Sequence, residues 1–218
     1  MTLHEPATFF TDLLLAVLGA WLALRLHRGY PPTASRRWWI AAMSSMALSA
    51  LVGGFYHGFA PELPPQVEAF WWRCVLWIIC GLGFAMGMSL LREFSHSNAW
   101  RTFLILKLLI SSVIVAWNPS FLVAIADYGL AMLAWTIASF ASRRLWRSAM
   151  LAGTGLSFMA AVVQQSQRGL TEFFNHNDLF HLVQALALIA FYRAGTDLNG
   201  TRTSFDLSAQ PSAGSSPG

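Results

Sequence analysis

Long apolar stretches alternate with short polar or proline-containing connections along most of the chain. A helix that crosses a bilayer needs about 20 mostly apolar residues. Segments of about this length occupy residues 9–26, 38–59, 69–91, 102–117, 121–141, 148–166 and 177–194. The pattern predicts an all-α, polytopic membrane protein, folded as a bundle of seven transmembrane helices. We expect residues 1–195 to form this domain, and residues 196–218, rich in Ser, Gly, Pro and Thr, to be a disordered cytoplasmic tail.

Composition supports the same class of protein. Hydrophobic residues make up 56% of the chain and charged residues 11%, which is too apolar for an ordinary soluble domain. Both cysteines, Cys74 and Cys80, fall inside the third apolar segment, so we expect them to be free thiols. The lipid bilayer is therefore the expected surroundings of most of the surface.

The distribution of arginine predicts the orientation. With the amino terminus outside, one side of the membrane receives eleven arginines and the opposite loops receive only Arg168. The eleven are Arg25, Arg28, Arg36, Arg37, Arg92, Arg101, Arg143, Arg144, Arg147, Arg193 and Arg202. Because cytoplasmic loops carry the excess of basic residues, the amino terminus is predicted outside and the carboxyl terminus in the cytoplasm.

The basic balance follows from this topology. The pI near 9.6 reflects residues that face the anionic inner leaflet, so no nucleic-acid partner is expected. The short loops and the lack of a recognisable targeting signal favour the inner membrane of a bacterial cell.

The last apolar segment opens with the most polar stretch near any membrane entrance, residues 175–184. On a helix Asn177, Asp178, His181 and Gln184 share one face, because they are three or four residues apart. Ionisable groups at membrane depth are costly and usually face the bundle interior, where they serve a function. This face is therefore the first candidate for a site.

Four more polar residues lie at comparable depth or deeper. His57 ends a face of small residues on the second segment, and it is either an interfacial histidine or a ligand. Asp12 either complements the helix dipole or belongs to a site, and Asp127 requires an ion-pair partner or a function. Lys107, on the fourth segment, is expected to extend towards the cytoplasmic side.

These residues suggest a zinc site near the outer face. Zinc accepts imidazole nitrogen and carboxylate oxygen, and a catalytic site combines three protein ligands with water. His57, His181 and Asp178 would supply them, with His176 as a competing third ligand. A zinc-bound water becomes a nucleophile at neutral pH, and Asp127 or Asp12 could act as the general base.

The segment Asn177–His181, together with Phe55-Tyr56-His57, resembles the CREST superfamily. That group contains seven-helix membrane proteins such as alkaline ceramidases, progestin/adiponectin receptors and haemolysin III-like proteins. Its pattern is Ser-x3-His in the second helix, an aspartate in the third and His-x3-His in the seventh. Here Gly53 occupies the serine position, Asn177 occupies that of the first seventh-helix histidine, and the third segment has no aspartate.

Three hypotheses follow from the residues and the resemblance together. The first is a zinc-dependent hydrolase of a lipid amide or ester. The second is a non-enzymatic seven-helix sensor or scaffold with a structural polar layer. The third is a haem-binding electron-transfer protein that uses His57 and His181 as axial ligands.

Overall fold

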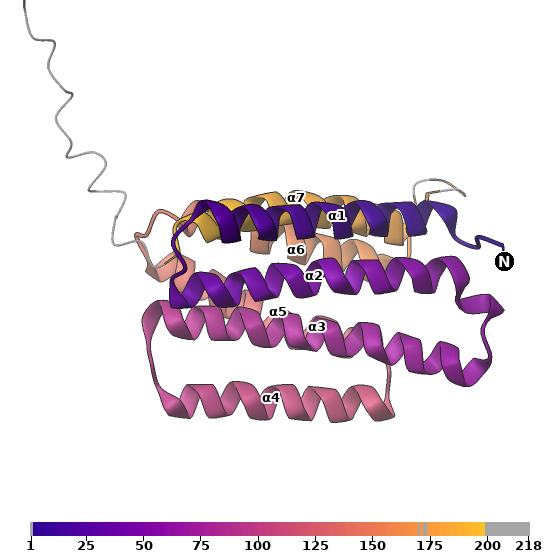
Figure 1. Ribbon diagram of the computed structural model, residues 1–218, viewed down its shortest axis with the longest axis horizontal. Helices are drawn as coiled ribbons and strands as arrows, with labels where there is room; N and C mark the ends of the chain where they lie inside the picture. Colours follow the sequence, from indigo (N-terminus) through magenta and orange to yellow (C-terminus); the bar gives the residue numbers. More distant parts are fainter. Residues whose placement is uncertain (1, 170, 172–173, 199–218) are drawn as a thin grey trace, which may run out of the picture.

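The computed structural model describes residues 2–169, 171 and 174–198, and these residues form a bundle of long helices (Figure 1). The α-helices are α1 (Pro6–Gly29), α2 (Ala34–Phe59), α3 (Pro65–Phe94), α4 (Asn98–Trp117), α5 (Phe121–Ala141), α6 (Arg147–Ser166) and α7 (His176–Thr196), with one 3-10 turn, η1 (Ala60–Glu62). Each of the seven predicted segments is a helix, and the described residues contain no β-strand. The all-α prediction is confirmed.

Six of these helices are long and apolar enough to cross a membrane, α6 being the exception among the described segments. The small and polar residues of α6, including Gly153, Thr154 and Ser157, lower its hydropathy. An integral membrane protein is therefore supported, whereas seven crossings and the orientation stay predictions.

The helices begin where the sequence supplies caps. Thr33, Ser97 and Ser120 each accept a hydrogen bond from a backbone N–H in the first turn of α2, α4 and α5. Pro6 and Pro65 stand at the starts of α1 and α3, where a missing N–H costs nothing. Local sequence alone thus sets most helix starts.

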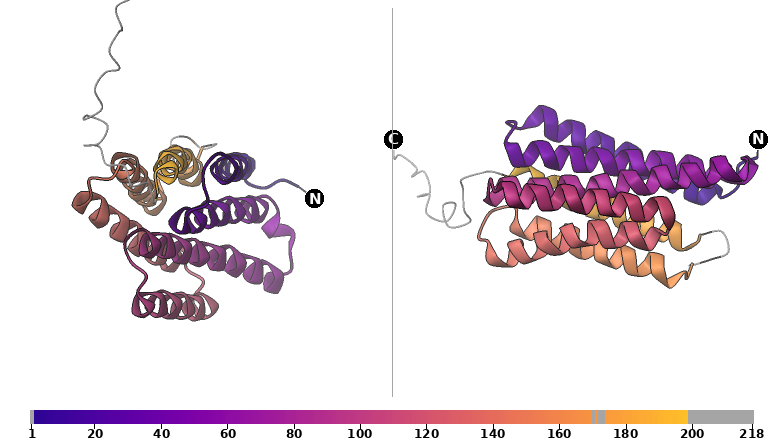
Figure 2. Two further views of the ribbon diagram at one scale, coloured as in Figure 1. Left: turned by 60° about the vertical axis from the view of Figure 1, so that its left-hand side comes forward. Right: turned by 90° about the horizontal axis from the view of Figure 1, so that it is seen from below.

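Consecutive helices run up and down, so α1, α3, α5 and α7 all start at what we call the amino-terminal end of the bundle (Figure 1). Helix α1 packs against α2 and α7, α3 against α2 and α5, and α6 against α7, while α2 touches α7 over a shorter stretch. Helix α4 lies at the edge, beside α3 (Figure 2). The first, second and seventh helices therefore meet at one corner.

Tryptophans fill the core towards the opposite end. Trp39, Trp135 and Trp146 are fully buried, and the ring of Trp135 lies 5.3 Å from each of the other two. Trp39 donates its indole N–H to the carbonyl of Phe191 at 2.9 Å, and Trp146 donates to Glu93 at 3.1 Å. Burial is favourable here because each indole N–H keeps an acceptor.

The packed domain extends slightly beyond residue 195. Helix α7 ends at Thr196, and the side chain of Leu198 is completely buried. Its carbonyl accepts a hydrogen bond from Arg36 at 3.1 Å. The remainder of the segment predicted to be a disordered tail, residues 199–218, lies outside the described part of the chain.

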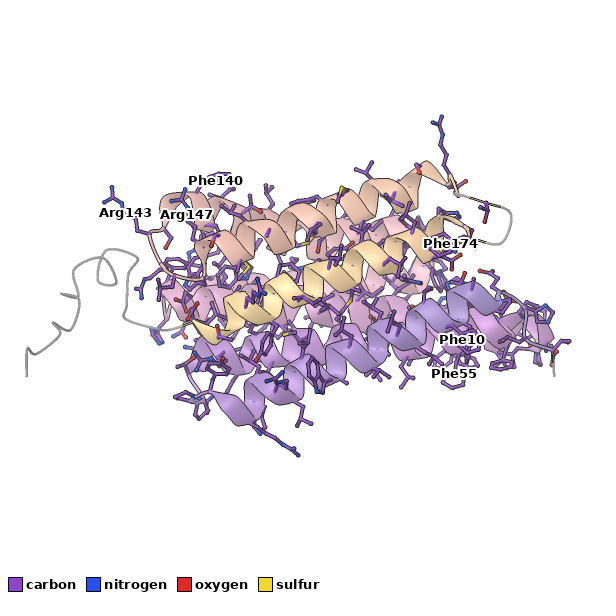
Figure 3. The ribbon with its side chains drawn as sticks, turned by 90° about the horizontal axis from the view of Figure 1, so that it is seen from above. Phe10, Phe55, Phe140, Arg143, Arg147 and Phe174 are labelled. Atoms are coloured by element: carbon purple, nitrogen blue, oxygen red, sulfur yellow. The ribbon has the colours of Figure 1, made fainter. Side chains whose placement is uncertain are left out.

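The arginines labelled in Figure 3 lie at one end of the bundle. Figure 3 shows Arg143 and Arg147 at one end, and Phe10, Phe55 and Phe174 at the other. The predicted cytoplasmic turn between α5 and α6 thus lies at the end opposite the amino terminus, as a consistent up-and-down topology requires.

Candidate functional site

Helix α7 starts with a reciprocal cap that uses one of the predicted ligands. The side chain of Asn175 accepts hydrogen bonds from the N–H groups of Asn177 and Asp178, and Asp178 Oδ2 accepts from the N–H of Asn175 at 2.7 Å. This is a capping box, in which two otherwise unpaired donors are satisfied. Asp178 is completely buried. It holds the start of α7 in place.

One turn further along α7, His181 meets a carboxylate from α1. His181 Nε2 lies 3.1 Å from Asp12 Oδ1, and both residues are more than nine-tenths buried. At this distance the two side chains share one hydrogen bond between α1 and α7. Asp12 is thus buried against His181, and its role in a site stays a prediction.

Thr11 closes the other side of the imidazole. Its hydroxyl lies 3.0 Å from His181 Nδ1 and 3.4 Å from Asp178 Oδ1. The groups form a continuous chain from Asp12 through His181 and Thr11 to Asp178. Thr11 is half-buried, so this chain runs from the interior towards the amino-terminal end of the bundle.

Glycines on α2 make room for the carboxylate. A Cβ at Gly54 would lie 2.8 Å from Cβ of Asp12, a distance that packed atoms do not tolerate. A Cβ at Gly53 would lie 3.8 Å from Asp12 Oδ2. The small-residue face predicted on the second helix therefore lets α1 approach closely, and the approach places Asp12 inside the bundle.

A cavity of about 70 Å³ adjoins the Asp12–His181 pair, enclosed by α1, α2, α3, α5 and α7. Asp12 Oδ2 and Gln184 Oε1 are buried on its wall without a hydrogen-bond partner among the described residues. Trp72 and Tyr128 add aromatic surface. Buried polar atoms are normally paired, so these two acceptors indicate an occupant that donates hydrogen bonds.

A second cavity of about 30 Å³ adjoins the first and shares Tyr128 and Gln184 with it. Its wall includes Ser157, whose buried hydroxyl also has no partner among the described residues. The polar interior therefore continues towards the middle of the bundle.

His57 belongs to a separate, shallower pair. Its Nδ1 lies 3.2 Å from Glu5 Oε2, and the Glu5 side chain is about half exposed. Hydrogen bonding to His57 holds the pKa of Glu5 below its ordinary value, with a smaller contribution from His176. His57 and His176 therefore face a surface carboxylate at the amino-terminal end.

Asp127 lies elsewhere. Its carboxylate is 2.6 Å from Lys107 Nζ and accepts a hydrogen bond from Ser111, so it is bound to α4. Lys107 also donates to the carbonyl of Asp127 at 3.1 Å. The expectation that Lys107 reaches the cytoplasmic side is wrong, because the buried carboxylate is the nearer partner. Asp127 does not line either cavity beside His181.

The expected zinc ligands are thus distributed over different contacts. His57 pairs with Glu5, Asp178 caps α7, and His181 pairs with Asp12. Among the described residues no group of three His, Cys, Asp or Glu side chains has metal-site geometry. The donor set does not fit the expected tetrahedral zinc site, so no chemical step is derived through a metal. Zinc binding stays a prediction.

Several site residues had weak sequence signals. Thr11 and Glu5 carry no motif, and only their position near Asp12 on the first helix distinguishes them. Gln184 belonged to the predicted polar face, but its contact with a cavity depends on the tertiary arrangement.

Comparison with known proteins gives one family. Residues 7–199 match the model of DUF6962, a family of unknown function. No curated protein and no solved structure matches the chain. Since the match extends from the start of α1 to just beyond the end of α7, this protein belongs to the DUF6962 family.

Proposed function

We propose that this protein is a membrane-embedded receptor for a small organic cation of the alkylammonium class, bound in the cavity between α1, α2, α3, α5 and α7. This is a specific form of the non-enzymatic sensor hypothesis. With the predicted orientation, the site lies under the outer face of a bacterial inner membrane.

The observation that carries the proposal is the unpartnered, buried oxygen of Asp12. A carboxylate in a low-dielectric interior is stable only when charge and hydrogen bonds compensate it. His181 contacts Asp12 Oδ1, whereas Asp12 Oδ2 and the side-chain oxygen of Gln184, Oε1, face the cavity. An ammonium group carries three donors and one positive charge, which matches this pair of acceptors.

The remaining wall suits the alkyl part of such a ligand. It is mainly apolar, with Met46, Val75 and Ile79 among its residues, and Trp72 and Tyr128 present aromatic rings. Aromatic faces attract cations. A cavity needs about 10–15 Å³ to hold one water molecule. The cavity of about 70 Å³ therefore holds one small organic cation or several waters.

The test is binding of methylammonium to the full chain in lipid nanodiscs, measured by isothermal titration calorimetry. Asp12→Asn should weaken binding by about tenfold to a hundredfold, since it removes a hydrogen bond to a charged group worth about 1.5–3 kcal/mol. Glu68→Gln, a matched change of a carboxylate at the same end that lies outside the cavity, should leave the affinity unchanged.

Ligand size gives a second criterion. Tetraethylammonium has no N–H donor and exceeds the cavity, so it should not compete with methylammonium. If neither ammonium nor methylammonium binds, or if Asp12→Asn binds methylammonium as tightly as the natural chain, the proposal is wrong.

Metal analysis of the same samples tests the zinc hydrolase implied by the CREST resemblance. That hypothesis predicts bound zinc in the natural chain, loss of it in His57→Ala and His181→Ala, and retention in His96→Ala. The cation receptor predicts that His57→Ala leaves methylammonium affinity unchanged, because His57 contacts Glu5 and does not line the cavity.

A further inference from the structure

We propose that the cavity is a cation–proton exchange site, in which binding of the organic cation expels one proton from His181 through Thr11 towards the amino-terminal end of the bundle. This inference rests on the proposed function and adds a coupling between cation binding and proton release that makes binding depend on pH.

The imidazole of His181 lies between two buried carboxylates. On one side is Asp12, 3.1 Å from Nε2, and on the other is Asp178, reached through the Thr11 hydroxyl. Asp178 accepts two kinds of donor at the α7 start, a backbone N–H and the Thr11 hydroxyl, and it lies at a helix N-terminus, so it is stable as an anion. Asp12 has only His181 among the described side chains. One proton shared by the Asp12 carboxylate and the His181 imidazole therefore compensates the buried Asp12 charge while the cavity holds no cation.

The contacts accommodate either protonation state without moving a heavy atom. When His181 is neutral, Nδ1 accepts from the Thr11 hydroxyl at 3.0 Å. When His181 is protonated, Nδ1 donates to the same oxygen, and the Thr11 hydroxyl rotates to donate to Asp178 or to the carbonyl of Thr8 at 3.1 Å. Rotation of the Thr11 hydroxyl prepares the relay, and the transfer is complete when Thr11 accepts the Nδ1 proton and releases its own hydroxyl proton.

The charges then balance in an exchange. An ammonium group at Asp12 Oδ2 supplies the positive charge that the shared proton supplied before, and it drives that proton onto His181 Nε2. Two cations beside one carboxylate in the interior repel each other, so the imidazolium loses its Nδ1 proton to Thr11. Thr11 is half-buried, and the proton leaves from it to water at that end. One cation enters and one proton leaves: an imidazolium N–H bond and the Thr11 O–H bond break, a new Thr11 O–H bond forms, and water takes up the released proton.

Other titratable groups around His181 are few and identifiable. Helix α1 contributes Glu5 ahead of Asp12, α2 contributes His57, and α7 contributes His176 at its first turn. The cavity adds Tyr128 from α5. Helix α6, which also packs on α7, has Arg147 as its only charged residue, at the opposite end.

Calorimetric titration of methylammonium in buffers of different ionisation enthalpy counts the protons released. About one proton per bound cation is expected, with the affinity rising about tenfold per pH unit over the range in which His181 changes protonation. His181→Gln keeps a donor for Asp12 but removes the imidazole that links Asp12 to Thr11, so binding should persist with slower proton release.

The relay through Thr11 has its own readout. Stopped-flow mixing with a pH-sensitive dye should show slower proton release in Thr11→Val, recovery in Thr11→Ser, and no change in Thr102→Val, an exposed position on α4. Binding of methylammonium without proton release in the natural chain overturns the exchange and leaves the receptor standing. Absence of binding at every pH overturns both.

Discussion

Asp12 and His181 define the chemistry of this protein at the scale of single residues. They lie 169 positions apart in the numbering, yet their polar atoms are 3.1 Å from each other inside the bundle. Water could replace this contact only if the interface between α1 and α7 opened, because both residues are buried. The shallower Glu5–His57 pair, by contrast, is partly exposed and should affect stability rather than ligand binding.

Glu5 should make stability depend on acid. Its pKa lies below the ordinary value of 4.5, mainly because His57 hydrogen-bonds to it, while partial burial opposes the shift. A lowered carboxylate pKa contributes stability that is present above the ordinary value and is lost as the pH falls through the lowered one. Since Glu5 is about half exposed, the contribution is at most about 1 kcal/mol.

The measurement is thermal unfolding of the natural chain and Glu5→Gln by tryptophan fluorescence. The natural chain should be more stable at pH 7, and the difference should shrink as the pH falls below 4.5, the ordinary pKa of Glu5. In a His57→Ala background the Glu5→Gln change should have little effect. An equal difference at both pH values would contradict this assignment.

At the scale of elements, Arg36 ties the start of α2 to the end of α7. The guanidinium donates to the carbonyls of Gly195 at 2.9 Å and Thr196 at 2.8 Å, as well as to Leu198 and Pro31. The last carbonyls of a helix have no partner within the helix. Arg36 supplies these donors, which explains how an arginine can be 4% exposed.

Arg36→Gln should destabilise the fold by about 1.5–3 kcal/mol, since it leaves buried carbonyls without their charged donor. The neighbouring Arg37 is exposed, so Arg37→Gln is the matched control and should change stability by less than about 0.5 kcal/mol. Urea or thermal denaturation of both variants gives the comparison. Equal loss in the two variants would argue against the capping role.

Helix α4 depends on a different polar contact. Of its residues only Val115 is fully buried, and the Lys107–Asp127 ion pair of 2.6 Å joins it to α5. A Cβ at Gly83 would lie 2.3 Å from Asp127 Oδ2, so α3 is shaped to admit this carboxylate. Attachment of α4 therefore relies on charge more than on packing.

Removing one partner should cost more than removing both. Lys107→Met or Asp127→Leu alone leaves a buried unpaired charge, at a cost of about 3–5 kcal/mol, whereas replacing both with apolar residues is often close to neutral. A double-mutant cycle on thermal unfolding measures the coupling. Additive effects of the two single changes would show that the pair is not energetically linked.

At the scale of the whole molecule, charge is unequally distributed between the two ends of the bundle. Arg143 and Arg147 lie opposite Phe10 and Phe55 in Figure 3, and most arginines lie at the helix ends or in the connections on the side of Arg143, which is the basic end of the bundle. The positive-inside rule predicts that this end faces the cytoplasm. The candidate site then faces the other side of the membrane.

Fusion reporters test this orientation. Green fluorescent protein attached to the carboxyl terminus should fluoresce, and alkaline phosphatase attached there should be inactive, because the first folds in the cytoplasm and the second requires export. The reverse pattern would place the site on the cytoplasmic side. It would leave the cavity unchanged but alter the source of its ligand.

The sequence by itself determined the helices. All seven predicted segments are helical. The signals that predict them are local: the length of each apolar segment, prolines at helix starts, and the capping residues Thr33, Ser97 and Ser120. It also determined that His181 would face the interior, because a polar face on an apolar helix has no stable alternative.

Only the tertiary structure decided which polar groups meet. Helix periodicity fixes the face of a residue but not the helix opposite it, so Asp12 could not be assigned to His181, nor Lys107 to Asp127, from spacing. His57 shares a corner of the bundle with His181 but pairs with Glu5, since the Glu5 carboxylate lies at the same depth as His57. The depth of each residue and the order of the helices depend on packing of the whole bundle. As a result, the residues expected to form one metal site lie in two pairs, His57 with Glu5 near the surface and His181 with Asp12 beside a cavity.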